Sequence, residues 1–295
     1  YLFRMKRIFS KFTSLLLAFV AFLICFIPVV YAAESDISWA VSSLGGSGGG
    51  FLFAIKRGSL DSSLYGLGEV TSGTVNYGNG VTSVNPSHVV KYNSSGVAQW
   101  TNGLSTTGSR YYGIGTDSED NIYVSGTIPI GLNNFGNSVT ATGVAAHNTI
   151  LVKYNSSGVA QWATAETTAP DYSEFTQSVT DSSGNTYAVG YIRGTDTFNF
   201  GNSVTVAGGN AGENGVIVKY NPSGVAQWAK STNSGVMDSV FYALKTDSTG
   251  TSYVGGYIGG ISTYDFGNSV TVTSAGSYNP IIVKYDTDGL AQWAK

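Results

Sequence analysis

Apolar and polar residues alternate along most of the chain in runs of 5–8 residues that are rich in Val, Ile, Tyr and Phe. Clusters of Asp, Asn, Ser and Gly bound these runs, and beyond the N-terminal segment no stretch carries apolar residues at helical spacing. Such a pattern is typical of short β-strands joined by tight turns. We therefore expect an all-β protein.

One eleven-residue sequence, Val-Lys-Tyr-Asn-Ser-Ser-Gly-Val-Ala-Gln-Trp, is repeated along the chain. It occupies residues 90–100, recurs unchanged at 152–162, and returns with small changes at 218–228 and 283–293, while residues 37–40 are an eroded copy. A period of 61–66 residues predicts a tandem array or a propeller. The repeat assigns one structural position to all five tryptophans and another to four turn glycines: Trp39, Trp100, Trp162, Trp228 and Trp293, and Gly96, Gly158, Gly224 and Gly289.

Each period contains two predicted hairpins, closed by turns such as Asp-Ser-Ser-Gly at 181–184 and Asn-Ser-Ser-Gly at 155–158. The Asp or Asn accepts a hydrogen bond from a backbone N–H two residues on, and the Gly adopts positive φ. Two hairpins make one four-stranded antiparallel sheet, or blade, and a Phe-Gly-Asn-Ser-Val-Thr segment adds a ribbon. The predicted blades cover residues 51–103, 108–166, 174–232 and 238–295, and the first has lost its Asp-x-x-Gly-Asn turn at 57–61.

A four-stranded sheet that is apolar on both faces cannot bury itself, whereas stacking against neighbouring sheets covers both faces. We therefore expect an all-β protein with a β-propeller fold of about four blades, and Trp100, Trp162 and Trp228 buried between blades. The strand at 37–42 belongs to an unfinished blade, because the last blade already has its own fourth strand at 290–295. The four blades are then an open arc of an incomplete ring of roughly six to eight blades, with uncovered apolar faces at both ends.

The succession Asp-Ser-Ser-Gly-Asn-x-Tyr-x-x-Gly-Tyr, Phe-Gly-Asn and Ile/Val-Val-Lys-Tyr-x-x-x-Gly-x-x-x-Trp-Ala resembles the secreted bacterial β-propeller repeat (SBBP-type) family. The resemblance covers about residues 108–295 well and 40–102 weakly. It implies a propeller fold and an exported or surface-bound bacterial protein. It implies no particular activity.

Residues 1–32 are predicted to be a secretory signal peptide, with residues 1–4 preceding the initiator Met5. A basic segment, an apolar run at 15–30 and small residues before the end of the segment at Ala32 support this interpretation. The run is shorter than the ~20 residues of a membrane span, which disfavours an uncleaved anchor, and bulky Ile24 disfavours lipidation of Cys25. We expect residues 33–295 to be a β-propeller repeat domain that is secreted or at the cell surface, with no membrane span after cleavage.

Four of the 15 basic residues lie in the predicted signal peptide, which leaves 11 against the 18 acidic residues of the chain. The exported protein therefore carries a net negative charge and has no basic patch. This composition argues against nucleic acid and anionic membranes as partners.

No candidate chemistry outweighs a structural role for the same residues. The Gly-x-x-x-Trp motif is similar to the docking motif of quinoprotein propellers, but the repeat already uses every Trp. The Asp-rich turns at 117–121 and 286–289 offer at most weak calcium sites, because neither has the closing bidentate acid of a calcium loop. We therefore predict no cofactor.

The remaining basic residues and histidines are also interpreted as structural. Arg57, Arg110 and Arg193 fall at different places in their blades, so we do not expect them to converge on a carboxylate as in sialidases. His88 and His147 precede third strands and have no further His or Cys ligand. The repeated lysines are expected to reach a neighbouring turn or solvent, although a ring of amines could also bind an anionic polymer: Lys91, Lys153, Lys219 and Lys284.

The sequence thus predicts an exported scaffold or binding module that presents loops to a protein or carbohydrate ligand and has no catalytic activity. Variable segments at 131–148 and 208–215 are the expected recognition surface, since loops on a rigid scaffold carry binding. The alternative is a propeller-type extracellular hydrolase or quinone-dependent oxidoreductase. That alternative requires a convergent cluster of acid, base and metal ligands, which the sequence does not reveal.

Overall fold

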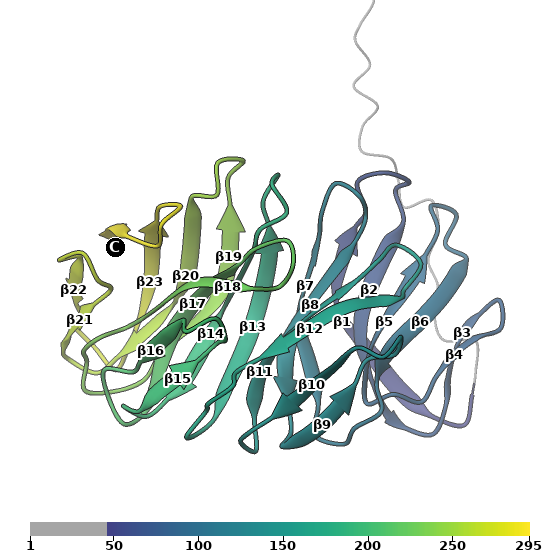
Figure 1. Ribbon diagram of the computed structural model, residues 1–295, viewed down its shortest axis with the longest axis horizontal. Coiled ribbons are helices and arrows are strands. Elements are labelled where there is room, and N and C mark those ends of the chain that lie inside the picture. Colours follow the sequence, from purple (N-terminus) through teal and green to yellow (C-terminus); the bar gives the residue numbers. More distant parts are fainter. Residues whose placement is uncertain (1–45) are drawn as a thin grey trace, which may run out of the picture. The chain divides into compact units, whose positions relative to one another are not determined.

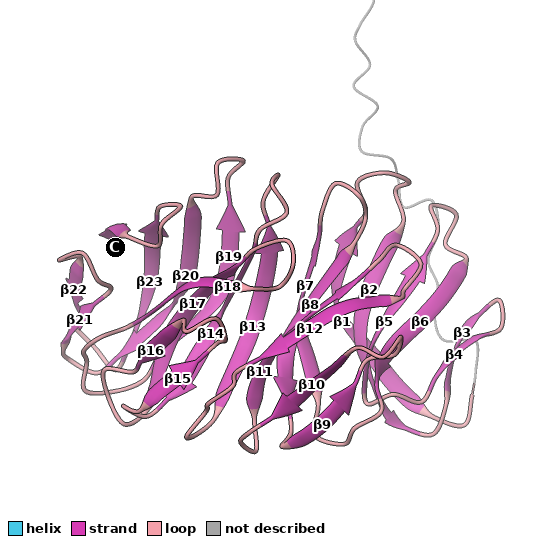
Figure 2. Ribbon diagram, viewed as in Figure 1, coloured by secondary structure: helices cyan, strands magenta, loops and turns pink. Residues whose placement is uncertain are grey.

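The computed structural model describes residues 46–295, in which every regular element is a β-strand (Figure 2). The strands form four antiparallel four-stranded sheets, which we number 1 to 4 in chain order. The prediction of an all-β chain with repeated four-stranded antiparallel sheets is confirmed. The predicted signal peptide, Trp39 and the strand at 37–42 lie outside the described residues.

Within each sheet the strands follow one another in chain order, interrupted only by a two-stranded ribbon between the second and third strands. Sheet 1 consists of β1 (Gly49–Arg57), β2 (Leu64–Ser72), β5 (Ser87–Tyr92) and β6 (Ala98–Leu104), and sheet 2 of β7 (Arg110–Thr116), β8 (Ile122–Ile128), β11 (Asn148–Tyr154) and β12 (Ala160–Ala165). Sheet 3 consists of β13 (Ser173–Thr180), β14 (Thr186–Arg193), β17 (Glu213–Tyr220) and β18 (Ala226–Ser231), and sheet 4 of β19 (Ser239–Thr246), β20 (Ser252–Gly259), β23 (Tyr278–Tyr285) and β24 (Ala291–Ala294).

The expected extra ribbon is present in all four periods. The ribbons are β3 (Val75–Gly78) with β4 (Val81–Ser83), β9 (Gly131–Asn134) with β10 (Thr140–Gly143), β15 (Thr197–Asn199) with β16 (Thr205–Ala207), and β21 (Thr263–Asp265) with β22 (Thr271–Thr273). Phe135, Phe200 and Phe266 of the Phe-Gly-Asn segments are buried, so the last three ribbons are fixed to their sheets by an aromatic anchor.

Successive sheets pack face to face, and the apolar core lies between them (Figure 1). We call the face that a sheet turns toward the following sheet its trailing face, and the face turned toward the preceding sheet its leading face. Tyr123 and Leu151 on the trailing face of sheet 2 are buried with Phe175, Val216 and Val218 of sheet 3. The alternation of strand side chains therefore supplies both faces of every joint, as the sequence pattern predicts.

The first strand of every sheet carries a β-bulge at the same register relative to the second strand, two to four residues after the first residue of the strand. Each bulge inserts one residue that is unmatched in the partner strand: Phe53, Tyr112, Thr176 and Tyr242. Because a bulge re-aims a side chain and bends its strand, this repeated position is a natural place for a surface feature shared by several sheets.

Two local predictions need correction. His88 lies inside β5 and is buried, whereas we expected a loop residue before the third strand. Trp100, Trp162 and Trp228 lie at the joints between sheets and pack against the core, but they are only partly buried, whereas we expected them to be buried.

Candidate functional site

The repeated Gly and Trp meet across each joint between sheets. Each Trp ring lies against the turn glycine of the next sheet: Trp100 against Gly158, Trp162 against Gly224 and Trp228 against Gly289. A Cβ added at Gly158 would lie 2.7 Å from Trp100 Cδ2, and the φ of Gly158 is 78°. The turn therefore needs glycine both for its backbone conformation and for the close approach of the indole.

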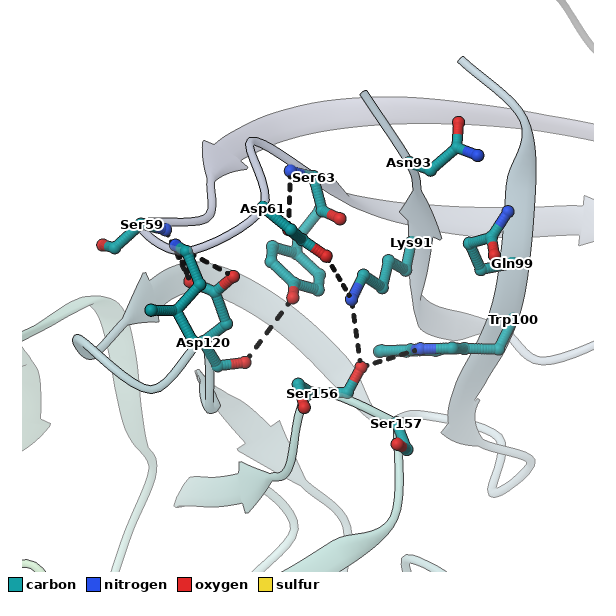
Figure 3. A network of polar contacts seen from close by, with 12 residues as sticks. Ser59, Asp61, Ser63, Lys91, Asn93, Gln99, Trp100, Asp120, Ser156 and Ser157 are labelled. Carbon is teal, nitrogen blue, oxygen red and sulfur yellow. Dashed lines mark hydrogen bonds and ion pairs between the residues drawn. The ribbon is translucent and has the colours of Figure 1, made fainter. Parts of the chain in front are cut away.

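The same tryptophans donate a hydrogen bond to the turn they contact. Trp100 Nε1 donates to Ser156 O at 3.2 Å, Trp162 Nε1 to Pro222 O at 3.1 Å and Trp228 Nε1 to Thr287 O at 3.0 Å. Figure 3 shows the first of these joints, in which Lys91 Nζ donates to the same Ser156 oxygen at 3.3 Å. Trp and Lys together hold the carbonyl of the neighbouring turn.

All four repeated lysines place Nζ over a tyrosine ring of their own sheet, at 5.1–5.6 Å from the ring centroid. Lys91 and Lys219 also reach the next turn, which confirms the structural role expected for them. Lys153 instead lies 3.8 Å from Asp117 Oδ2. Because these ammonium groups already contact rings, carbonyls or carboxylates, they do not form a free cationic surface for an anionic polymer.

A cleft of about 310 Å³ opens beside the joint between sheets 1 and 2 (Figure 3). Its wall includes Asp61, which pairs with Lys91 Nζ at 3.4 Å. Hydrogen bonds from Ser63 lower the pKa of Asp61 to about 2, so this carboxylate is charged at any physiological pH. The polar groups of the cleft are largely occupied by one another, and the cleft belongs to the structural joint.

In the Asp-rich turn at 117–121, both carboxylate oxygens of Asp117 already accept hydrogen bonds from the protein. Asp117 Oδ1 accepts the backbone N–H groups of Glu119 and Asn121, both at 2.9 Å, and Oδ2 accepts from Asn121 Nδ2 and from the Tyr123 hydroxyl. Within residues 46–295, no three side chains of the His, Cys, Asp or Glu type are grouped so that they could hold a metal ion.

The two histidines occupy different environments. His88 Nε2 is hydrogen-bonded to the Tyr77 hydroxyl, and burial lowers the pKa of His88 to about 4, so its ring is neutral. The ring of His147 packs against Tyr172, with centroids 4.8 Å apart. The structure therefore does not bring the two histidines together as a ligand pair.

The three arginines also have separate partners. Arg57 donates to Ser62 Oγ, Arg110 lies 3.6 Å from Glu69, and Arg193 lies 3.9 Å from Asp171. Arg57 stands at the end of its first strand and Arg110 at the start of its own, so they lie at opposite ends of β1 and β7. No three-arginine site is formed in the described part of the chain.

Sheets 2, 3 and 4 together carry a cluster that the sequence analysis did not identify. Its aromatic members come from the bulges of β7 and β19 and from β14, β20 and β23: Tyr112, Tyr242, Tyr191, Tyr257 and Tyr278. Its acidic members are Glu174 at the start of β13 and Glu213 at the start of β17. We call these seven residues the tyrosine–carboxylate patch.

The tyrosine rings of sheet 4 contact one another in a row. The ring centroids of Tyr242 and Tyr257 are 6.1 Å apart, and those of Tyr257 and Tyr278 are 5.3 Å apart in an edge-to-face arrangement. Tyr242 and Tyr278 are exposed, while Tyr257 between them is half-buried. The rings of Tyr242 and Tyr278 are therefore accessible to a ligand, and the half-buried ring of Tyr257 between them is held by packing.

The carboxylates are electrostatically coupled to these rings and to each other. Burial, and then the charge of Glu213, raises the pKa of Glu174. Burial and the charge of Asp238 raise the pKa of Glu213. Tyr191 lies near both glutamates, and its pKa is raised by burial first and then by Glu174 and Glu213. The patch thus groups tyrosine hydroxyls, which can donate hydrogen bonds, with two acidic side chains, which can accept them.

Arg110 and Arg193 lie beside the glutamates of the patch. The guanidinium of Arg110 acts on Glu174 and on the Tyr112 hydroxyl, and Arg193 acts on Glu213, to which it is directly opposite in the β14–β17 ladder. Each arginine also has a carboxylate partner outside the patch. The two arginines are therefore shared among four acidic residues, two in the patch and two outside it, and do not cancel the negative charge of the surface.

The two predicted recognition loops differ in their relation to this patch. Segment 208–215 leads into the patch, because it contains the patch residue Glu213. The side chain of Asn214 holds this loop in place by accepting hydrogen bonds from the backbone N–H groups of Gly209 and Asn210. Segment 131–148 forms the ribbon of sheet 2, and its Asn148 fixes the following loop in the same way through Val144 and Ala145.

A register comparison of the repeats is the sequence signal that could have revealed the patch. Tyr112 and Tyr242 share one repeat position with Phe53 and Thr176, and Tyr191 and Tyr257 share another with Glu69 and Thr127. Both positions vary between repeats, unlike the Trp and Gly positions. Their common location depends on the bulge, which the sequence pattern does not show.

No helix in the described range has the length and apolar character needed to cross a membrane. Comparison of the chain with protein-family models and with curated protein sequences gives no match.

Proposed function

We propose that this protein is an exported β-propeller-type scaffold of the kind that the SBBP-like repeat suggests, and that it binds a saccharide at the tyrosine–carboxylate patch. The four stacked sheets with their bulged first strands support the propeller interpretation. The exported location rests on the signal-like sequence of residues 1–32. The single observation that carries the binding proposal is the row of tyrosine rings beside two coupled glutamates.

A saccharide has apolar C–H faces and hydroxyl edges, and the patch offers a complement to both. Tyrosine combines a flat apolar ring with a polar tip, so Tyr242, Tyr257 and Tyr278 can cover a sugar face while their hydroxyls bond to its edge. Glu174 and Glu213 accept hydrogen bonds from sugar hydroxyls or from an amino group. The negative charge of the surface opposes sulfated or uronic saccharides, which favours neutral and amino-bearing sugars.

Screening of the purified chain against a panel of immobilised neutral, amino-bearing and acidic oligosaccharides tests this proposal. We expect retention of neutral or amino-bearing members and no retention of acidic ones. Failure to retain any member of the panel, or preferential retention of acidic members, would contradict the proposal.

A glycoside hydrolase is the second candidate, because two neighbouring carboxyls with raised pKa values are also what acid catalysis of that reaction uses. Incubation of the bound saccharide with the wild-type protein and with Glu174→Gln and Glu213→Gln distinguishes the two functions. Scaffold binding predicts no new reducing ends with any of the three proteins. Reducing ends that appear with the wild type and vanish in either variant would assign catalysis to the patch.

A further inference from the structure

The hairpin turn of the first ribbon differs from the other three at one position. The turns of β9–β10, β15–β16 and β21–β22 read Gly-Asn-Ser, whereas β3 and β4 are joined by Gly-Asn-Gly at 78–80. The asparagines are all exposed and have φ angles of 50–52°: Asn79, Asn137, Asn202 and Asn268. The residue after the asparagine also has positive φ, 76° at Gly80 and 60° at each of the three serines. The four turns therefore hold asparagine in one backbone conformation before two different residues.

The asparagine side chain is also held in the same way in all four ribbons. Asn79 Nδ2 donates to Ala98 O at 2.9 Å, and its counterparts donate to the equivalent carbonyl of their own fourth strand at 2.8–3.0 Å. Gly80 does not prevent a clash, because no atom lies within 4 Å of a Cβ added there. Ser138 shows that serine fits the corresponding place in the turn. The missing side chain at position 80 is thus a chemical difference with no packing role.

Deamidation of asparagine begins with the backbone nitrogen of the following residue. At this turn the nitrogen of Gly80 would lose its proton and bond to Cγ of Asn79, and the side-chain nitrogen would leave as ammonia. Water then opens the five-membered imide at either carbonyl, which gives aspartate or isoaspartate. A side chain on the attacking residue crowds this ring closure and restricts the backbone, and glycine imposes neither restraint.

Asparagine precedes glycine at two further places, both of them in strands: Asn102–Gly103 in β6 and Asn214–Gly215 in β17. Asn214 is fully buried, and the Gly215 N–H already donates to Ser239 Oγ at 3.0 Å. The Gly103 N–H donates to the Asn102 side-chain oxygen at 2.7 Å, so its N–H bond points at the oxygen and not at the amide carbon. Strand pairing resists the backbone rotation that ring closure requires at both pairs.

We propose that Asn79 is a site of spontaneous deamidation, and that its conversion loosens the β3–β4 ribbon from β6. The carboxylate of the product has no N–H with which to donate to Ala98 O, and it places a negative charge beside that carbonyl oxygen. Isoaspartate also adds a methylene to the backbone of a two-residue turn, whose conformation depends on positive φ at both positions. The modification therefore removes the contact between turn and sheet that the other three ribbons keep.

Peptide mapping by mass spectrometry, on the folded chain incubated at mildly alkaline pH, measures the rate at each asparagine. We expect Asn79 to deamidate about tenfold faster than the asparagines of the other three ribbons, a barrier difference of about 1.4 kcal/mol. Equal rates at the four turns would overturn the proposal, and so would faster conversion at Asn102 or Asn214.

Two reciprocal variants test whether the residue after the asparagine sets the rate. Gly80→Ser gives the first turn the sequence of the others, and Ser138→Gly gives the second turn the sequence of the first. We expect Gly80→Ser to slow Asn79 to the rate of its counterparts, and Ser138→Gly to accelerate Asn137 to the wild-type rate of Asn79. An Asn79 that deamidates as fast in Gly80→Ser as in the wild type would contradict the proposal.

Asn79→Asp reproduces the aspartate product and tests the structural consequence. We expect the backbone amides of β3 and β4 to exchange with solvent faster than in the wild type, while those of β15 and β16 keep their rates. Circular dichroism verifies that the variant remains folded. Unchanged amide exchange in β3 and β4 would show that deamidation does not loosen the ribbon.

Discussion

At the scale of single residues, the repeat is explained by one contact, the indole of Trp against the backbone of Gly. The glycine serves two purposes at Gly158, where φ is 78° and Trp100 leaves no room for a Cβ. At Gly136 φ is 89° but no atom lies within 4 Å of an added Cβ. The two positions therefore separate the backbone requirement from the steric one.

We predict that Gly158→Ala destabilises the protein more than Gly136→Ala. An L-residue at positive φ costs roughly 1–2 kcal/mol, and the contact with Trp100 should raise the loss at Gly158 to about 2–4 kcal/mol through forced repacking. Urea unfolding of both variants measures the difference. Equal losses would show that the indole does not require the glycine.

Glu166 follows β12 in the joint between sheets 2 and 3, where its buried carboxylate accepts a hydrogen bond from Ser173. The corresponding contact between sheets 3 and 4 joins two hydroxyls, Thr232 and Ser239, at 2.7 Å. Burial raises the pKa of Glu166 to about 7 from its ordinary value of 4.5. The native protein therefore holds a proton there that the unfolded chain releases above pH 4.5, and stability falls as the pH rises from 4.5 to 7.

Glu166→Gln should remove this part of the pH dependence. The shift in pKa corresponds to about 3 kcal/mol, so the variant should gain roughly that much stability relative to the wild type between pH 4.5 and pH 7.5. Denaturant unfolding of both proteins at the two pH values measures this difference. The other carboxyl groups contribute equally to the free energy of unfolding of both proteins, so their contributions cancel. If the free energies of unfolding of the two proteins changed in parallel between these pH values, the prediction would be wrong.

At the scale of elements, the strands and the regular turns could be predicted from the sequence, and the irregular ones could not. The turn at 181–185 forms as expected, with Asp181 accepting the N–H groups of Ser183 and Asn185. The first hairpin of sheet 1 lacks these residues, and a side chain from the next sheet replaces them. Asp120 accepts the N–H groups of Ser59 and Leu60, a contact 60 residues distant that no local pattern reveals.

We predict that Asp120→Ala loosens the turn at 58–63. The change removes the acceptor of two backbone donors, at a cost of about 1–3 kcal/mol, and leaves a residue with φ of 58° that alanine tolerates poorly. Amide exchange at Ser59 and Leu60 should accelerate, whereas the amides of Ser183 and Asn185 should keep their protection. Asp120→Asn, which retains an acceptor and suits positive φ, is the matched control and should restore most of the protection. Unchanged exchange in Asp120→Ala would contradict this account of the turn.

At the scale of the whole molecule, the sequence predicts the stacking of sheets because the apolar alternation of each strand requires two partners. It does not predict the tyrosine–carboxylate patch, whose residues are contributed by seven strands of three sheets. Tyr112 and Tyr242 join it through bulges, and bulges depend on pairing between strands. The charge composition argues only against nucleic acid and anionic membranes as partners. The proposal of a saccharide ligand rests on the grouping of tyrosine rings and carboxylates.

The central claim is that the tyrosine–carboxylate patch binds saccharide, and calorimetric titration of a retained oligosaccharide tests it most directly. Tyr257 stands in the middle of the aromatic row, so Tyr257→Ala should weaken binding by about tenfold or more through lost ring contact. Lys245→Ala, an exposed change on β19 three residues beyond Tyr242, should bind like the wild type. An unchanged dissociation constant for Tyr257→Ala, or an equal loss in both variants, would contradict the claim.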